Sequence, residues 1–470
     1  MHAGKDKTQA HTPVAPVGAI PADAPVEQDV TRRGFLKHAA AAGGVLGLNS
    51  VWQAEAVADE PERLKPIGEA QGIHPGRVVW VHDPQATDWK GPGDGRWYEA
   101  HHTKQDRVSE MLSRAVLEVA GETTLATAWD KLFRHLNQAR GKGDVAYKPG
   151  EKIVIKPNWV GMCWWWGKVD PESYTLVQYQ DYMNTSPQMI IALLRQLVGM
   201  GVQEADLTVC DTLAYLVHEY YDILHREFPK VQYVDHAGKF GRLRVQASAV
   251  PVFWSCRPSG AAPDFLPTCF AEAEYLINLA NLKAHACTGV TLCGKNHFGS
   301  LVRWPVQQGY YDMHRHSFAK ETKLYREQVD LMGHAHLGGK TVLYLIDGLY
   351  PGKHSIDPAP RRWSSPPFQG HWASSMLASQ DPVAIDSVGC DFLWAEWDDY
   401  PRQVGVDDYL HEAALAASPP SGTFYDPDHP TPVKRLTSLG VHEHWNNPQD
   451  KKYSRNLGTG NGIELVAVAR

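Results

Sequence analysis

The chain has 470 residues, of which 43% are hydrophobic and 21% are charged, and its formal net charge is −7. This composition is typical of a soluble globular protein and excludes a fibrous or wholly disordered one. A net negative charge without a long basic block gives no general attraction for nucleic acid or anionic lipid, so we predict no nucleic-acid partner.

The N-terminal segment has the pattern of an export signal. The stretch "TRRGFLK" at 31–37 is followed by the weakly apolar "HAAAAGGVLGL" and then by small residues at Ala54, Ala56 and Ala58. Paired arginines, a modest apolar run and an A-x-A exit are typical of a twin-arginine signal peptide. The run is too short for a membrane span of ~20 residues. We therefore predict a signal peptide with a disordered leader at 1–56, the twin-arginine export machinery as a partner, no stable membrane span, and a periplasmic or extracellular location.

The remaining chain alternates between strand-like and helix-like segments. Strands are predicted at 77–83, 152–158, 206–211, 231–235, 275–282 and 341–348, with a last one in "IELVAVA" near the C-terminus. Helices are predicted at about 105–140 and at 186–201, 216–228 and 381–397. Several strands are short β-branched apolar runs without alternation, as in sheets buried on both faces. This rhythm predicts an α/β fold with a mostly parallel sheet flanked by helices.

Three parts are expected after the signal peptide. Residues 57–149 would form an N-terminal strand and a helical addition packed on the core, and residues 150–400 would form the core domain. Residues 401–470 would form a C-terminal extension with a helix and a loop-rich tail.

Polar residues follow nearly every predicted strand. In open parallel sheets ligands bind outside the carboxyl ends of the strands, so scattered segments would converge on one site. The residues concerned are His82, Asp83, Lys156, Asn158, Asp211, Lys283, His285, Asp347 and Gly348.

The segment "KIVIKPNWVG" places a cation and an amide at one strand end. Lys156 and Asn158 suit an anionic or carbonyl-bearing ligand, and a solvated strand-end turn is the alternative. Trp159 is included among the ligand-binding candidates. The following Trp164, Trp165 and Trp166 fit either an aromatic platform or loop packing.

The segment "LKAHACTGVTLCGKNHFG" at 282–299 carries the densest set of reactive residues. Lys283 and His285 would share a side of an extended strand. Gly289, Gly294 and Gly299 would permit tight turns, and Lys295 and Asn296 would supply donors to a phosphate or carboxylate. Neither a Walker A loop nor a G-x-G-x-x-G fingerprint is present.

Histidines and cysteines leave the cofactor open. "MHRHS" and "GHAHL" both contain H-x-H, so we predict a divalent metal on His285, His314, His316 and Asp347, with surface or hydrogen-bonded histidines as the alternative. The seven cysteines include no C-x-x-C pair, so no ferredoxin-type iron–sulfur motif is present. Cys256 and Cys269 are the candidate disulfide pair.

Four segments together resemble the family called domain of unknown function 362. They are "IVIKPN", "YLINLANLKAHACTGVTLCGKNHFGS", "LYLIDGLYPG" and "LASQDPVAIDSVGCDFL", which cover about 150–400. Some relatives carry a four-iron ferredoxin module whose cysteine pattern this chain lacks. The resemblance implies that the family's polar positions here are Lys156, Asn158, Lys283, His285, Lys295, Asn296, Asp347, Asp381 and Asp386.

These observations predict an exported enzyme that acts on an anionic small molecule in a basic cleft. His285, Lys283, Lys295 and Asp347 would be catalytic, and Lys156, Asn158, Asn296, Trp159 and Asp386 would bind the ligand. A non-catalytic periplasmic binding protein and an accessory protein for cofactor or metal maturation are the alternatives.

Overall fold

The computed structural model describes residues 64–164, 167–177, 183–257, 261–302, 323–354 and 357–469. The chain divides into two units between Val57 and Ala58, and the fold below is that of the second unit. The predicted signal peptide lies outside the described residues.

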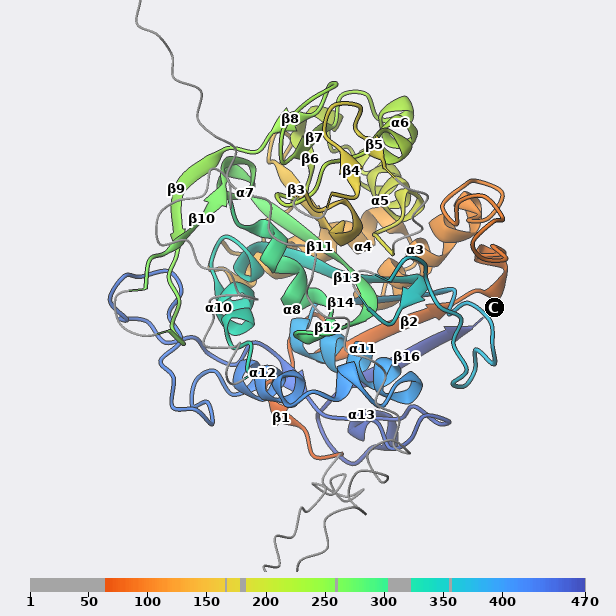
Figure 1. Cartoon of the computed structure of the whole chain (residues 1–470). Helices are drawn as coiled ribbons and strands as arrows, with labels where there is room; N and C mark the ends of the chain where they lie inside the picture. The colour runs from red at the N-terminus through yellow and green to blue at the C-terminus, as the bar shows by residue number, and fades with distance from the viewer. Residues whose placement is uncertain are drawn as a thin grey trace, which may run out of the picture. The chain divides into compact units, whose positions relative to one another are not determined.

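A ten-stranded sheet forms the centre of the unit (Figure 1). The strands follow along the sheet in the order β16 (Glu464–Ala469), β2 (Arg77–His82), β14 (Ser375–Ser379), β13 (Thr341–Gly352), β11 (Tyr275–His285), β3 (Ile153–Pro157), β6 (Leu207–Cys210), β7 (Gln232–Asp235) and β8 (Leu243–Arg244). A tenth strand, β12 (Gly289–Thr291), pairs with the end of β11. Among these described strands, only β14 and β12 run antiparallel to their neighbours.

Three two-stranded ribbons lie outside this sheet. They are β1 (Ile67–Gly68) with β15 (Val441–His442), β9 (Ala247–Val252) with β10 (Asp264–Pro267), and β4 (Val169–Asp170) with β5 (Thr175–Leu176).

Helices flank the sheet on both faces. They are α3 (Gln105–Ala120), α4 (Leu125–Ala139), α5 (Pro187–Gly199), α6 (His218–Glu227), α7 (Thr268–Glu272), α8 (Cys293–Asn296), α10 (Glu327–Gly333), α11 (Pro382–Glu396), α12 (Val404–Ala414) and α13 (Ser454–Leu457). This architecture confirms the predicted α/β fold with a mostly parallel sheet.

The helix at 187–199 begins and ends as its sequence predicts. The Ser186 hydroxyl accepts a hydrogen bond from the Met189 N–H, and Pro187 occupies the first helical position. Gly201 follows the helix with a φ of +102°, a left-handed conformation that glycine adopts without strain. Local sequence therefore sets the bounds of α5, whose N-terminus lies next to the carboxyl ends of the strands.

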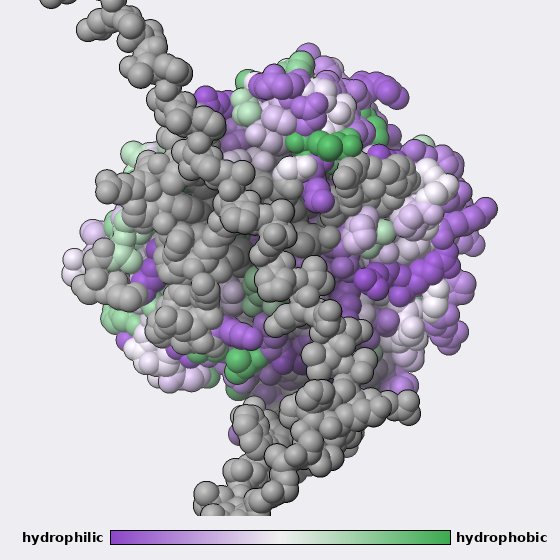
Figure 2. Space-filling view, in the orientation of Figure 1, coloured by the Kyte–Doolittle hydropathy of each residue, from purple (hydrophilic) through white to green (hydrophobic). Residues whose placement is uncertain are grey.

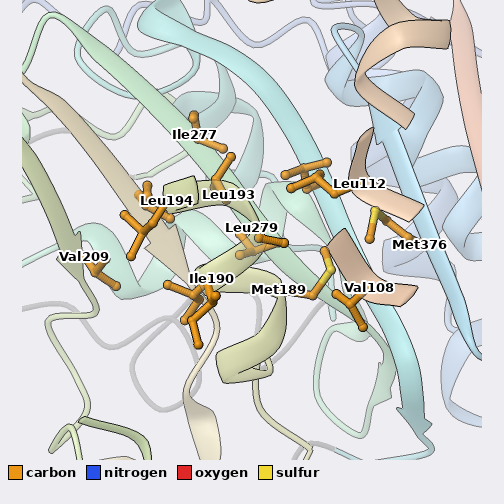
Figure 3. Packing of buried hydrophobic residues seen from close by; sticks show 14 of the residues in the cluster. Val108, Leu112, Met189, Ile190, Leu193, Leu194, Val209, Ile277, Leu279 and Met376 are labelled. Atoms are coloured by element: carbon orange, nitrogen blue, oxygen red, sulfur yellow. The ribbon is translucent and has the colours of Figure 1, made fainter. Parts of the chain in front are cut away.

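Alternate residues of the central strands face two separate cores. Ile277 and Leu279 of β11 pack with side chains of α3 and α5, as Figure 3 shows. Ala280 and Leu282 of the same strand pack against residues of α11 and α12. Because both faces are covered, β11 reads as a continuous apolar run rather than an alternating one.

The terminal segments join the same sheet as the family-like middle of the chain. Strand β2 pairs with β14, and β16 pairs with β2. Helix α3 contacts β2 and β14, and α4 contacts β13. Residues on either side of 150–400 therefore complete the central sheet.

The described surface offers few large apolar side chains. On the face shown in Figure 2, hydrophobic residues are scattered among hydrophilic ones. The exposed large hydrophobic residues are Val177, Phe240, Leu243, Val404, Phe424, Val433 and Leu457. Among the described residues, no helix combines the length and apolar character that a membrane crossing requires.

Candidate functional site

Polar residues from four parallel strands meet at one edge of the sheet. Strands β3, β6, β11 and β13 run in the same direction, so their carboxyl ends lie at the same edge. Lys156 ends β3, Asp211 follows β6, Lys283 and His285 end β11, and Asp347 lies in β13. All five side chains are buried. The strands thus bring together residues that lie up to 191 positions apart in the sequence.

Lys156 is fully buried and pairs with a carboxylate. Its ammonium is 3.0 Å from Oδ2 of Asp211 and 3.1 Å from Oδ1 of Asn296, and it also donates to the Pro157 carbonyl. The same Asp211 oxygen accepts a hydrogen bond from the Trp159 N–H at 3.2 Å. The positive charge of Lys156 is thereby balanced within the protein, which a buried charge requires.

Asn296 connects two strands through all of its amide groups. Its Nδ2 donates to the Lys156 carbonyl at 3.0 Å and to Oδ1 of Asn278 at 2.8 Å. Its Oδ1 accepts from Lys156 and, at 3.0 Å, from Nδ2 of Asn158. A side chain with its hydrogen-bonding capacity filled in this way organises the site.

The short helix α8 carries Lys295 and Asn296 and is anchored from a distant helix. Oδ1 of Asp386 accepts the Cys293 N–H at 2.7 Å, and Oδ2 accepts the Gly294 N–H at 2.8 Å and the Tyr409 hydroxyl at 3.2 Å. Burial raises the pKa of Asp386 to about 7, while its hydrogen bonds from the Gly294 and Cys293 N–H groups oppose this shift. Asp386 therefore positions the site rather than lining it.

Two of the three predicted turn glycines have another role. Gly289 has a φ of +76° and makes the turn of the β11–β12 hairpin as predicted. Gly294 lies inside α8, and Gly299 lies in a 3-10 turn at His297–Ser300. A Cβ at Gly299 would lie 2.8 Å from the Lys156 ammonium, so this glycine is required for space. Neither Gly294 nor Gly299 has a positive φ, so close packing rather than backbone conformation selects glycine at these two positions.

Lys283 is buried with few hydrogen bonds. Its ammonium donates to the Met183 carbonyl at 2.9 Å, which is its only hydrogen bond within the described part of the chain. Burial lowers its pKa to about 7. Lys295 and Lys156 act in the same direction, whereas Cys163 and Asp211 act against it. Lysines whose pKa is shifted in this way are typical of functional sites.

His285 shares a strand face with Lys283, and its ring orientation is fixed. Its Nδ1 accepts the Cys287 N–H at 3.0 Å and the Thr288 N–H at 3.3 Å. The neutral ring therefore carries its proton on Nε2. Because a metal-binding histidine normally donates its second N–H to an acceptor, this arrangement suits a hydrogen-bond donor better than a metal ligand.

Asp347 holds the start of helix α5. Its Oδ2 accepts the Ser186 N–H at 2.9 Å, and its Oδ1 accepts the Leu349 N–H at 3.0 Å. Burial raises its pKa, and these hydrogen bonds oppose the shift. Both oxygens are thus already engaged by backbone groups.

The predicted metal site is not assembled from the described residues. No group of three His, Cys, Asp or Glu side chains there that includes His285 or Asp347 brings its ligand atoms together. His314 and His316 lie outside the described residues. The metal site therefore stays a prediction.

The remaining predicted residues take different positions. Lys295 is buried, with its ammonium 4.4 Å from the centroid of the Phe298 ring. Trp159 lies in the core and donates from Nε1 to the Thr185 carbonyl at 3.3 Å. Trp164 stacks on His236 with ring centroids 4.9 Å apart, while Trp165 and Trp166 lie outside the described residues.

The expected pairing of Cys256 with Cys269 is wrong. None of the seven cysteines forms a disulfide bond. The side chain of Cys269 instead lies within hydrogen-bonding reach of Cys210. The spacing of two cysteines around a loop is therefore a poor guide to which thiols meet.

Several buried polar atoms near this edge have no hydrogen-bond partner in the described structure. They are Oδ1 of Asn158, Nδ2 of Asn281, Nδ1 of His297 and Oγ of Ser300. Asn281 and Asn158 lie on either side of Thr185, which is hydrogen-bonded to both. Because buried polar groups are nearly always paired, these atoms are candidate contacts for a ligand or water.

Asn278 is among the residues of the site that were not selected from the sequence. Asn278 donates to the Cys293 carbonyl at 2.9 Å and lies 3.1 Å from Nε2 of His297. Burial and the nearby Lys156 lower the pKa of His297 to about 3, so the ring is neutral. The signal that could have found Asn278 is an amide inside an otherwise apolar strand, where an unpaired polar group would be costly.

Comparison with known proteins places these residues in a family. A search of curated proteins finds no match to the chain. The model of the family described as a domain of unknown function, DUF362, matches residues 153–391. The match contains β3, α8, β11, β13 and the Asp386 anchor. Since it spans more than half of the chain, the protein belongs to the DUF362 family.

Proposed function

We propose that the protein is an enzyme that acts on an anionic small molecule at the carboxyl edge of its sheet. The observation that carries the proposal is Lys283, a buried amine with a single described hydrogen bond and a pKa lowered to about 7. Holding such a group in a folded protein is costly, and a bound anion would offset that cost. Lys295 lies within electrostatic reach and adds positive charge, whereas the charge of Lys156 is balanced by Asp211.

The chemistry this site can supply is proton transfer beside a bound anion. An amine with a pKa near neutrality exchanges a proton readily at the operating pH. The Nε2–H of His285 and Nδ2 of Asn281 can donate to a substrate oxygen, and Oδ1 of Asn158 can accept from a substrate hydroxyl. Lys295 would complete the cationic side of the site.

A non-catalytic binding or accessory role is the second candidate. It is favoured by Asp347 and Asp386, whose carboxylate oxygens are all engaged by N–H or O–H groups of the protein. Neither carboxylate is then offered as a general base. A protein that retains a co-purified anion through dialysis, and turns over nothing in host extracts, would be a binding protein.

Replacing Lys283 with methionine should abolish anion binding without harming the fold. Sulfate is the probe, because its charge does not change near neutral pH. The protonated amine binds the anion, so wild-type affinity should fall as pH rises through about 7. Calorimetric titration at about pH 6 and pH 8.5 measures this, and we expect at least a tenfold loss of affinity in Lys283→Met.

The matched control is Lys152→Met, at the opposite end of β3. Lys152 is 48% exposed and pairs with Glu272, so its removal makes the same charge change away from the site. Sulfate binding that is equal in Lys283→Met and wild type would contradict the proposal. Failure of wild-type protein to bind sulfate would also count against it.

The same variant tests the lowered pKa of Lys283 through the pH dependence of the free energy of unfolding. The folded-state pKa of Lys283 lies below the unfolded value, so the unfolded chain holds more protons between about pH 7 and 10.4. The amine's contribution to the free energy of unfolding therefore rises with pH across that window. In denaturant titrations, the free energy of unfolding of wild type relative to that of Lys283→Met should increase with pH.

We place this activity outside the cytoplasm as part of the proposal. The support is the stretch "TRRGFLK" with its apolar run and small-residue exit. Changing both Arg32 and Arg33 to lysine should leave the protein in the cytoplasmic fraction of its host as the unprocessed precursor. Normal export of that double variant would rule out the twin-arginine route.

A further inference from the structure

Three metal-ligating side chains meet in the C-terminal extension, beyond the matched family domain. Asp407 lies on α12, His442 ends β15, and His444 follows two residues later. A ligand atom of each lies within 4.8 Å of those of the other two. Nε2 of His444 is 3.5 Å from Oδ1 of Asp407. Two ligand atoms of a tetrahedral zinc site lie about 3.4 Å apart when the bonds are about 2.1 Å.

Hydrogen bonds behind the two imidazoles fix which nitrogen faces this cluster. Nδ1 of His444 is 2.7 Å from Oδ1 of Asp391, and Nδ1 of His442 is 2.8 Å from Oγ of Ser387. The Ser387 hydroxyl donates to the Val383 carbonyl at 2.7 Å, so it accepts from His442. Each Nδ1 is therefore a donor, and each neutral ring has its lone pair on Nε2. Metal-binding histidines are held in this way.

Regular secondary structure brings the two histidines opposite the two α11 residues that hold them. Ser387 and Asp391 are four residues apart on α11 and so share a helix face. His442 and His444 are two residues apart in extended chain and so share a side. Glu443 between them points to a separate network, where its carboxylate accepts the Ser454 hydroxyl at 2.8 Å.

A buried oxygen of the Asp407 carboxylate, Oδ1, faces the cluster and lies 3.5 Å from Nε2 of His444. This oxygen has no hydrogen-bond partner in the described part of the chain. The lone pair of a neutral His444 would face this oxygen, and that contact is favourable only with a cation between the two atoms or a proton on the ring. We propose that Asp407, His442 and His444 bind a divalent transition metal of the Zn²⁺ type.

The site has the features of an open metal centre. Three protein ligands leave a coordination position for water or a substrate oxygen. The Asp407 side chain is 40% exposed, which gives a route of entry, whereas the two histidines are largely buried. His411, one turn after Asp407 on α12, flanks the cluster with its ring centroid 5.0 Å from that of His442.

A second cluster offers a comparison within the same protein. Glu99, His101 and His102 also bring ligand atoms together. There the His101 side chain is 67% exposed, and the ring nitrogens of His102 lie next to Asp88 and the Asp94 carbonyl. Because both His102 nitrogens are already engaged, this cluster serves as the control.

The test titrates Zn²⁺ into the full exported chain after treatment with EDTA. A chromophoric chelator measures the affinity, and elemental analysis gives the stoichiometry. We expect one Zn²⁺ per chain, a higher melting temperature with zinc, and a loss of affinity of at least tenfold in Asp407→Asn and in His442→Gln. Asp391→Asn, which weakens the hydrogen bond to Nδ1 of His444, should lower zinc affinity about 10–100-fold. His101→Ala and Lys283→Met should bind zinc as wild type does.

Each outcome decides the proposal. Asp407→Asn alters a partly exposed side chain with no described hydrogen bond at Oδ1, so it tests the site even if His442→Gln fails to fold. Undiminished zinc binding in Asp407→Asn, loss of zinc in His101→Ala, or no zinc binding by wild type would each overturn it. The last result would identify the group as a protonated His444 held between two carboxylates.

Discussion

Replacing Lys156 with methionine should lower the free energy of unfolding by about 3–5 kcal/mol, because the change leaves Asp211 as a buried, unpaired charge. The ammonium and the carboxylate are 3.0 Å apart, and both side chains are almost completely inaccessible to solvent. Asn296 also loses a donor to its Oδ1. Denaturant titration measures the difference, and Lys152→Met should change stability by less than about 1 kcal/mol.

The same ion pair can be disturbed from the opposite side. In Gly299→Ala the new methyl group would lie 2.8 Å from the Lys156 ammonium and 3.0 Å from Oδ1 of Asp211, so the pair must separate. Gly199→Ala is the control, since a Cβ there meets no atom within 4 Å and alanine favours the helix by up to about 1 kcal/mol. Equal stability of Lys156→Met, Gly299→Ala and wild type would show that the pair is not closed in solution.

Replacing Asp386 with alanine should cost about 2–6 kcal/mol. The change leaves the N–H groups of Cys293 and Gly294 buried without acceptors, at about 1–3 kcal/mol each. Helix α8 has four residues and little intrinsic stability, so Lys295 and Asn296 should lose their fixed positions. Weakened sulfate binding should accompany the loss of stability.

Two milder variants grade this effect. Asp386→Asn keeps one acceptor and should cost less than the alanine variant. Tyr409→Phe removes a single hydrogen bond to Asp386 and should cost about 1 kcal/mol. If Asp386→Ala lowers stability no more than Tyr409→Phe does, the carboxylate is not what holds α8.

The strand ends were predictable from local sequence, because strand direction and strand length suffice to place them. Lys156 and Lys283 follow apolar runs that clearly predict strands. The prediction stopped β11 at residue 282, three residues early. The strand continues because Lys283 and His285 pair with the hairpin strand β12, whose three residues give no periodic signal.

Contacts between segments that are distant in the sequence could not be predicted from it. The anchor of α8 is Asp386, 93 residues away from Cys293. Its sequence position predicts a helix residue facing a cleft, whereas both of its oxygens bind backbone N–H groups. A carboxylate at a given position has the same appearance in the sequence whether it meets a substrate or a peptide group.

The histidine pairs show the same limit. The pattern H-x-H occurs at His314, at His334 and at His442. Near His334 the structure shows a ring engaged by the Pro251 carbonyl and the His336 N–H. At His442 the proposed third ligand, Asp407, lies on α12, and the residues that orient the two histidines, Ser387 and Asp391, lie on α11. Spacing alone does not distinguish these cases.

Helix α11 carries residues that are hydrogen-bonded to both polar centres. Asp386 faces α8, while Ser387 and Asp391 hold the two histidines of the C-terminal cluster. If this helix shifts as a rigid body, its hydrogen bonds to α8 and its hydrogen bonds to the two histidines change together. If the proposed metal and the proposed anion both bind, any factor by which metal occupancy changes anion affinity must equal the factor by which the anion changes metal affinity.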